Sequence, residues 1–191
     1  MEVGVLALQG AFREHRKLLK DCGVSSREIR KPEQLKGIDG IIIPGGESTS
    51  IGKLMDRYGF IQPIKEMAQE GLPVFGTCAG LVLLAKDIEG SSQPRLGLMD
   101  MEVVRNGFGR QVESFEADLD ISVLGFNPFR GVFIRAPYIK NISPNIGILA
   151  SYNNKIVFAR QGNLLACSFH PELTDDRRVH RYFLDMVEQG C

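Results

Sequence analysis

The sequence has no excess of charge and no long hydrophobic run, and each absence excludes a class of partner. Its 23 Lys and Arg residues balance 23 Asp and Glu residues, so no net field attracts nucleic acid or an anionic membrane. The longest nearly apolar stretch, residues 72–85, is too short to span a bilayer and is interrupted by Pro, Gly and Thr. We therefore expect neither nucleic acid nor a membrane as a partner.

The cysteines show no clustering either. Four of them lie far apart in the chain: Cys22, Cys78, Cys167 and Cys191. None forms a C-x-x-C pair or a metal-like pairing with histidine, which argues against a disulfide framework and a zinc site. Glu2 stands where a signal peptide would carry positive charge, and the apolar run after it is short. We expect a cytoplasmic protein with reduced thiols, no metal site and no bound cofactor.

Apolar patterns in the first half of the chain alternate between strand and helix. Runs typical of buried strands cover residues 3–8, 38–43 and 72–75, and helical spacing covers 11–22, 48–58, 61–69 and 81–85. Such alternation indicates an α/β protein whose mostly parallel sheet has helices on both faces. With 191 residues and no linker or repeat, we expect one domain, residues 1–191.

Beyond Gly90 the pattern changes to short strand-like segments separated by turns. These segments cover residues 98–104, 112–123, 131–135, 146–151, 154–160 and 163–169. They predict a mixed sheet rather than a purely parallel one. A final helix is expected to begin near Thr174 as its N-cap, with Asp175 and Asp176 in the first turn.

The segment around Cys78 is the most informative stretch of the chain. An apolar run reaches this cysteine, which has Gly76 and Gly80 two residues to either side, and a helix-like run follows. This is the pattern of a nucleophile elbow, in which the glycines permit a strained turn and close approach. A helix N-terminus behind the cysteine favours the thiolate and offers N–H groups to an oxyanion. A buried structural cysteine in a tight turn fits the same pattern.

A cysteine nucleophile needs a neighbouring base, since its free pKa is about 8.5. His15 falls on the apolar stripe of the first helix and His180 within the last helix, so we expect structural roles for both. His170 ends an apolar strand and is followed by Pro171 and Glu172. In extended backbone, residues two apart project to the same side, so the carboxylate can orient the imidazole as in a catalytic triad.

The loop of residues 44–48, Pro-Gly-Gly-Glu-Ser, follows another predicted strand. It should lie at the carboxyl edge of the sheet, where open α/β folds bind ligands, and its glycines can present an N–H to an oxyanion. It lacks the Gly-Lys-Ser/Thr ending of a phosphate loop. A plain strand–helix turn is the alternative interpretation.

Taken together, Gly-x-Cys-x-Gly, Pro-Gly-Gly and the late His-x-Glu resemble the class I (triad) glutamine amidotransferases. Longer segments resemble the glutaminase subunits of pyridoxal 5′-phosphate synthase: residues 8–15, 44–49, 105–111, 133–137 and 168–173. The likeness runs from Val3 to about Val187. It implies a flavodoxin-like class I glutaminase fold, with Cys78 as nucleophile and His170 and Glu172 as its relay.

The resemblance also implies a glutamine site and an oxyanion hole. The implied glutamine contacts are Gly46, Glu47, Ser48, Arg105, Ile134 and Arg135, and the implied oxyanion donors are Gly46 and Ala79. A cationic side chain suits the α-carboxylate of glutamine, although structural ion pairs would equally explain the two arginines. Gln9 and the helix after it are implied to face a partner subunit.

The implied activity is hydrolysis of L-glutamine to glutamate and ammonia through a glutamyl thioester. The ammonia would pass to a separate pyridoxal 5′-phosphate synthase subunit within a large hetero-oligomer. Three alternatives stay open: a glutaminase serving another synthase, such as imidazole-glycerol-phosphate synthase, a cysteine peptidase on the same fold, and a non-catalytic thiol sensor.

Overall fold

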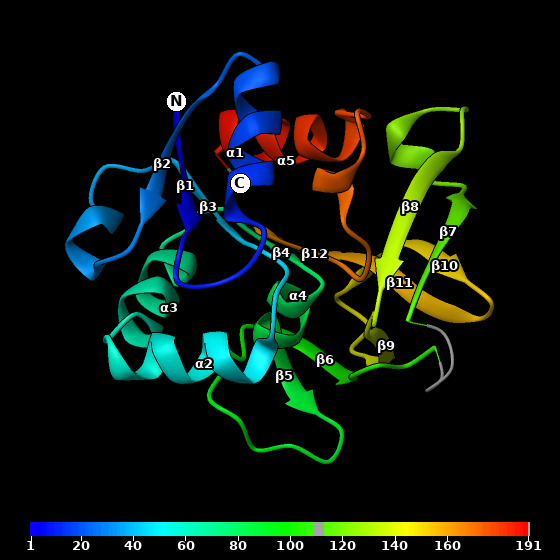
Figure 1. The fold of residues 1–191 in the computed structure, drawn as a ribbon, viewed down its shortest axis with the longest axis horizontal. Coiled ribbons are helices and arrows are strands. Elements are labelled where there is room, and N and C mark those ends of the chain that lie inside the picture. The colour runs from blue at the N-terminus through cyan, green and yellow to red at the C-terminus, as the bar shows by residue number, and fades with distance from the viewer. Residues whose placement is uncertain (109–112, 191) are drawn as a thin grey trace.

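The structure is a computed structural model that describes residues 1–108 and 113–190. Within these ranges ten strands form one mixed sheet in the order β2-β1-β3-β4-β12-β11-β9-β6-β5, and β10 pairs with β11 at the side of this path (Figure 1). Three parts of the sequence-based predictions lie outside the described residues. They are Cys191, residue 112 of the strand expected at 112–123, and residues 109–111 of the segment 105–111.

One half of the sheet is parallel. Its strands are β2 (Ser25–Ile29), β1 (Glu2–Leu6), β3 (Gly40–Ile43), β4 (Val74–Thr77) and β12 (Leu164–Cys167). β3 and β4 are buried along their whole length, as expected for strands covered on both faces. Within β3, Ile41 and Ile43 pack into one core and Ile42 into the other, because successive side chains project to opposite faces.

The other half is mainly antiparallel. Its strands are β5 (Ala85–Ile88), β6 (Met99–Val104), β9 (Tyr138–Ile142), β10 (Gly147–Tyr152) and β11 (Lys155–Gln161). Among the strand pairings described in this half, only that of β5 with β6 is parallel. β7 (Ser114–Leu119) and β8 (Phe129–Ile134) form a separate antiparallel pair. The mixed, mostly parallel α/β architecture predicted from the sequence is confirmed by the strand pairing and by the solved structures described below.

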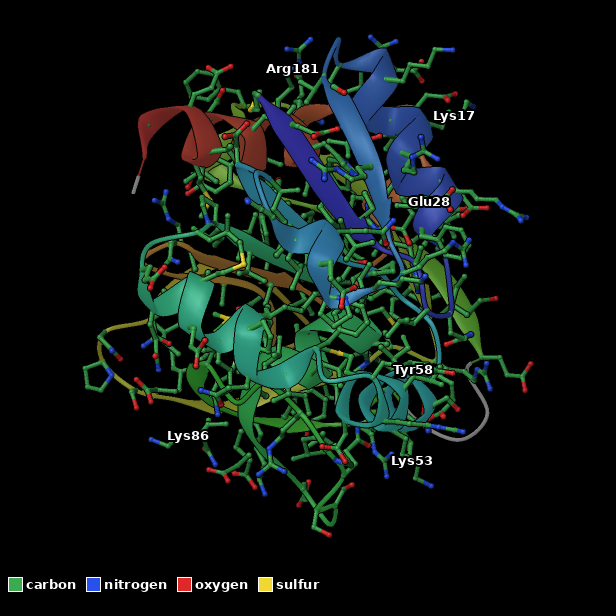
Figure 2. All side chains as sticks on the ribbon, turned by 90° about the vertical axis from the view of Figure 1, so that its left-hand side faces the viewer. Lys17, Glu28, Lys53, Tyr58, Lys86 and Arg181 are labelled. Carbon is green, nitrogen blue, oxygen red and sulfur yellow. The ribbon has the colours of Figure 1, made fainter. Side chains whose placement is uncertain are left out.

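Helices cover both faces of the parallel half. The helices are α1 (Phe12–Asp21), α2 (Ser48–Arg57), α3 (Ile61–Gln69), α4 (Ala79–Leu84) and α5 (Arg178–Gln189). α1 and α5 pack on one face, and α2, α3 and α4 pack on the other (Figure 1). Figure 2 shows Lys17 of α1 and Lys53 of α2 on the outer sides of their helices. No helix within the described ranges is long and apolar enough to cross a membrane.

Several sequence expectations differ from the structure. β2, β5 and β9 were not predicted, and the start of the last helix was placed too early. Thr174 caps no helix: its hydroxyl accepts the Asp176 N–H, and the Asp176 carboxylate accepts the Arg178 N–H where α5 begins. The polar side chains at this point stabilise a short irregular turn rather than a first helical turn.

Candidate active site

Three predicted segments meet where neighbouring parallel strands end. The loop of residues 44–48 follows β3, Cys78 follows β4, and residues 168–172 follow β12. Hydrogen bonds tie these ends together: the Cys78 N–H donates to the Cys167 carbonyl at 2.8 Å, and the Gly45 N–H donates to Thr77 Oγ1 at 3.1 Å. The carboxyl edge of the sheet thus brings the three segments into contact, as the strand pattern predicts.

Cys78 stands at a sharp turn between β4 and α4. Its φ of 49° and ψ of −100° lie outside the regions that side chains other than glycine favour, so the turn is strained. A Cβ at Gly76 would overlap the backbone of Gly80, and a Cβ at Gly80 would overlap the carbonyl of Ile43. Both flanking glycines are therefore required by close packing. The local geometry is that of the predicted nucleophile elbow.

His170 and Glu172 form a buried pair beside the cysteine. His170 Nδ1 lies 2.7 Å from Glu172 Oε1. The backbone joining them is a 3₁₀ turn, η3 (Pro171–Leu173), and not the extended segment that we predicted from the sequence. Proline suits the first position of such a turn, where its missing N–H has no partner to lose. The expected contact between His170 and Glu172 is present, but a 3₁₀ turn brings the two side chains together and not an extended backbone.

The surroundings favour a charged His170. Burial lowers its pKa, but hydrogen bonding to the Cys78 and Glu172 side chains and their negative charge outweigh burial and raise the pKa to about 10. Burial raises the pKa of Glu172, but the neighbouring His15 and His170 lower it to below its usual value. The arrangement holds an imidazolium between the sulfur of Cys78 and the carboxylate of Glu172.

A pocket of about 310 Å³ opens in front of Cys78. Nine of the ten predicted site residues line it: Gly46, Glu47, Ser48, Cys78, Ala79, Arg105, Ile134, Arg135 and His170. The tenth, Glu172, lies behind His170. The Ile134 carbonyl is 3.8 Å from Cys78 Sγ. Among the described residues, the backbone N–H groups of Gly46 and Ala79 have no hydrogen-bond acceptor, and both residues face the pocket.

Charged groups ring the mouth of the pocket. The Arg105 guanidinium donates to Thr49 Oγ1 and Gln93 Oε1, both at 3.0 Å. Within residues 1–108 and 113–190, neither Arg105 nor Arg135 makes an ion pair, so the structural ion-pair alternative has no support there. The Glu47 carboxylate caps α2 by accepting the N–H groups of its first turn. Burial opposes ionisation of Glu47, yet these hydrogen bonds and that of the Ser50 hydroxyl lower its pKa to about 2.

Sequence reasoning missed other residues of the site. Gln9, Val82, Asn106 and Pro137 also line the pocket. Gln9 lies in the pocket wall, where its Oε1 accepts the Glu47 N–H at 2.8 Å, and the implied contact of Gln9 with a partner subunit stays a prediction. The Asn106-Gly107 dipeptide was an available turn signal, since Asn106 adopts a φ of 50°. In the described part of the chain, no cluster of His, Cys, Asp and Glu is arranged to hold a metal ion.

The fold and site together define the chain as a class I-type glutamine amidotransferase. A solved structure described as a glutamine amidotransferase superimposes with a TM-score of 0.93 at 52% identity, covering 97% of this chain and 98% of that one. The model of the SNO glutamine amidotransferase family matches residues 5–189, and the chain belongs to this family. The resemblance stated from the sequence is therefore confirmed.

Relatives of known name agree with this membership. A protein named pyridoxal 5′-phosphate synthase subunit PdxT from Pelotomaculum thermopropionicum is 64% identical over 97% of this chain and 94% of its own length. A protein of the same name from Desulforamulus reducens is 62% identical over 98% of this chain and all of its own length. A putative GMP synthase subunit from Thermoplasma acidophilum, at 16% identity and a TM-score of 0.73, shares the fold.

Proposed function

We propose that this chain is the glutaminase subunit of a pyridoxal 5′-phosphate synthase and that Cys78, His170 and Glu172 are its catalytic triad. The observation that carries the proposal is the strained Cys78 elbow facing a pocket beside the buried His170–Glu172 pair. Family membership and relatives named as subunits of this synthase support the same activity.

The triad geometry supports a thioester mechanism. The Cys78 thiolate attacks the side-chain amide carbon of glutamine, and the N–H groups of Gly46 and Ala79 hold the oxyanion. An imidazolium with a pKa of about 10 is protonated at neutral pH, so His170 already carries the proton that the leaving ammonia needs. The neutral imidazole then accepts a proton from water, which cleaves the thioester to release glutamate. Glu172 remains ionised and stabilises the imidazolium throughout.

Free glutamine differs from a peptide by its α-carboxylate and α-ammonium groups, and the pocket offers a partner for each. Arg105 and Arg135 are cations without a described carboxylate partner, which suits the α-carboxylate. The Glu47 carboxylate stays charged and suits the α-ammonium group. The walls formed by Ser48 and Ile134 complete the contacts that we assign to the substrate. These charges favour the amino acid over an internal peptide segment and so disfavour the peptidase alternative.

The ammonia requires an acceptor that this chain does not supply. We assign that role to a separate synthase subunit, joined to this chain in a large hetero-oligomer in the cytoplasm. Ammonia released into water becomes ammonium and loses its nucleophilic lone pair, so delivery within a complex preserves its reactivity. The names of the relatives, which describe each as a synthase subunit, support this assembly.

Glutamate release from glutamine, measured with and without the synthase subunit, tests the proposal. We expect hydrolysis in the assembled complex and its loss in Cys78→Ala. Cleavage of peptide reporters would favour the peptidase, and absence of hydrolysis in the complex would favour the thiol sensor. Strong hydrolysis only with a different synthase would replace the assigned partner.

A further inference from the structure

A buried chain of polar side chains extends behind the triad. His15 of α1 places Nε2 3.4 Å from Glu172 Oε2, on the side of the carboxylate away from His170. The same nitrogen is 3.1 Å from Thr77 Oγ1. His15 Nδ1 lies 2.9 Å from Nε2 of His180 in α5. The side chains of His15 and Glu172 have no solvent exposure, and His180 is equally buried. His170 and His15 thus lie on two sides of one carboxylate, and His180, the third histidine of the sequence, contacts His15.

Both outer histidines are neutral, so the position of their protons matters. Burial lowers the pKa of His15, and burial together with the neighbouring His15 lowers the pKa of His180 to about 3. The charged or titratable groups that act on His15 are Glu172 and His170 from the triad, His180 from α5 and Glu14 from its own helix. A neutral imidazole has one N–H donor and one acceptor nitrogen. Two arrangements of the His15–His180 hydrogen bond are therefore conceivable.

Hydrogen-bond satisfaction selects one of them. If His15 donates from Nδ1, the His180 proton must sit on Nδ1, a buried atom that has no partner among the described residues. The bare Nε2 lone pair of His15 would then face the ionised carboxylate of Glu172. If instead His180 donates from Nε2, His15 accepts on Nδ1 and directs its own Nε2–H toward Glu172 and Thr77. In this arrangement each buried N–H of the two imidazoles faces an acceptor. A buried N–H without an acceptor costs more free energy than a buried acceptor nitrogen without a donor.

We propose that His15 is a positioning residue of the glutaminase, fixed by His180 in the Nε2–H form so that it donates toward Glu172 and keeps that carboxylate aimed at His170. The inference rests on the proposed function for its link to turnover. His15 also holds Thr77, whose Oγ1 accepts the Gly45 N–H beside the proposed oxyanion donor Gly46. One side chain of α1 therefore supports both the base and the oxyanion loop.

The first test uses the unaltered chain and needs no activity. Because the chain has only three histidines, long-range ¹H–¹⁵N spectra of histidine-labelled protein assign each tautomer separately. We expect His15 and His180 as neutral Nε2–H forms and His170 as a cation at neutral pH. A proton on Nδ1 of His15 would overturn the proposal.

The second test separates positioning from folding. His15→Leu removes the donor, whereas His15→Gln places an amide N–H near the position of Nε2. In the assembled complex we expect His15→Leu to lower kcat about tenfold with little change in KM, since it deletes the N–H group that faces the buried carboxylate of Glu172 and contacts Thr77. His15→Gln should restore most of that loss. The pH profile of iodoacetamide alkylation at Cys78, followed by mass spectrometry of its peptide, should move only in His15→Leu.

Leu184→Ala is the matched control, because it removes a buried apolar side chain from α5 and leaves every polar group of the His180–His15–Glu172 chain in place. It should lower stability and leave the alkylation profile in place. Equal kcat in His15→Leu and wild type, or equal loss in His15→Leu and His15→Gln, would refute the positioning role. Failure of the wild-type complex to hydrolyse glutamine would instead refute the proposed function, and the tautomer measurement would still judge the hydrogen-bond chain.

Discussion

The parallel and antiparallel halves of the sheet supply different parts of the site. The ends of β3, β4 and β12 in the parallel half provide the Gly45–Gly46 loop, Cys78 and His170. Arg105 follows β6 of the antiparallel half, and the Ile134–Arg135 segment lies at the end of β8 in the separate β7–β8 pair; together these residues form what we call the recognition wall of the pocket. We infer that the parallel half carries the chemical step together with the Glu47 and Ser48 contacts to substrate, and that the recognition wall carries the binding of the α-carboxylate.

The two regions also differ in how they are held. Cys78, His170 and Glu172 are buried and tied to backbone or to one another. Arg105 lies at the pocket mouth and depends on two side-chain acceptors from other elements. Substitutions in the first region should therefore lower kcat, and substitutions in the second should raise KM.

Cys78→Ala should have the largest effect. It removes the nucleophile, so glutamine hydrolysis should fall at least about a thousandfold, while the substrate pocket remains. Glutamate release and glutamine binding, measured on the same preparation by calorimetry, check both halves of this expectation. If the variant loses glutamine binding together with hydrolysis, the assignment of chemistry and substrate binding to separate regions is wrong.

Glu172→Gln should rank second, with a fall in kcat of about a hundredfold, because the imidazolium loses its charged partner. Because its pKa is raised, His170 stays protonated until the pH rises through about 10. In the wild type, kcat/KM and the stability that the His170–Glu172 ion pair contributes should therefore both decline as the pH passes about 10. The amide removes part of that upward shift. The alkaline limb of the pH–rate profile should therefore move to lower pH, and an unmoved limb would contradict the assigned pair.

The two regions were unequally visible in the sequence. Cys78 could be predicted because its signals are local: an apolar strand, two glycines and a helix within a few residues. His15 and His180 could not, because a histidine on a helical apolar stripe has the pattern of a core residue. His15 of α1 contacts both His180 of α5 and Glu172 of η3 across the fold, and no local spacing encodes such contacts.

The fold shows the same contrast between local and long-range signals. The buried strands β3 and β4 are continuous apolar runs and were predicted. β2 has the sequence Ser-Ser-Arg-Glu-Ile and is only partly buried, because it lies at the edge of the sheet, so it gave no hydrophobic pattern. β5 follows α4 without a connecting loop, and its start was therefore included in the predicted helix.

Arg105→Ala tests the recognition wall directly. Loss of the guanidinium should raise KM for glutamine about thirtyfold and change kcat by less than about threefold, as expected for a group that binds substrate and transition state alike. Arg105→Lys should recover only part of the affinity, because an ammonium group cannot donate to the carboxylate, Thr49 and Gln93 in one planar geometry. Steady-state measurement of kcat and KM in the assembled complex checks this expectation. A fall in kcat at unchanged KM would show that Arg105 acts in the chemical step and not in substrate binding.

Gln93→Leu should give the smallest effect and the finest test of the comparison. Gln93 is buried in the segment between β5 and β6, touches none of the pocket-lining atoms assigned to chemistry, and accepts from both Arg105 and Thr49. Removing this acceptor leaves the guanidinium charged but free to leave its position. We expect KM to rise about threefold to fivefold at unchanged kcat, roughly the value of one modest hydrogen bond. Gln93→Glu offers the matched control, since it keeps the acceptor oxygens. A rise in KM in both variants would mean that Gln93 acts through packing. The position of Arg105 would then depend on how the whole segment between β5 and β6 packs, and not on one hydrogen bond.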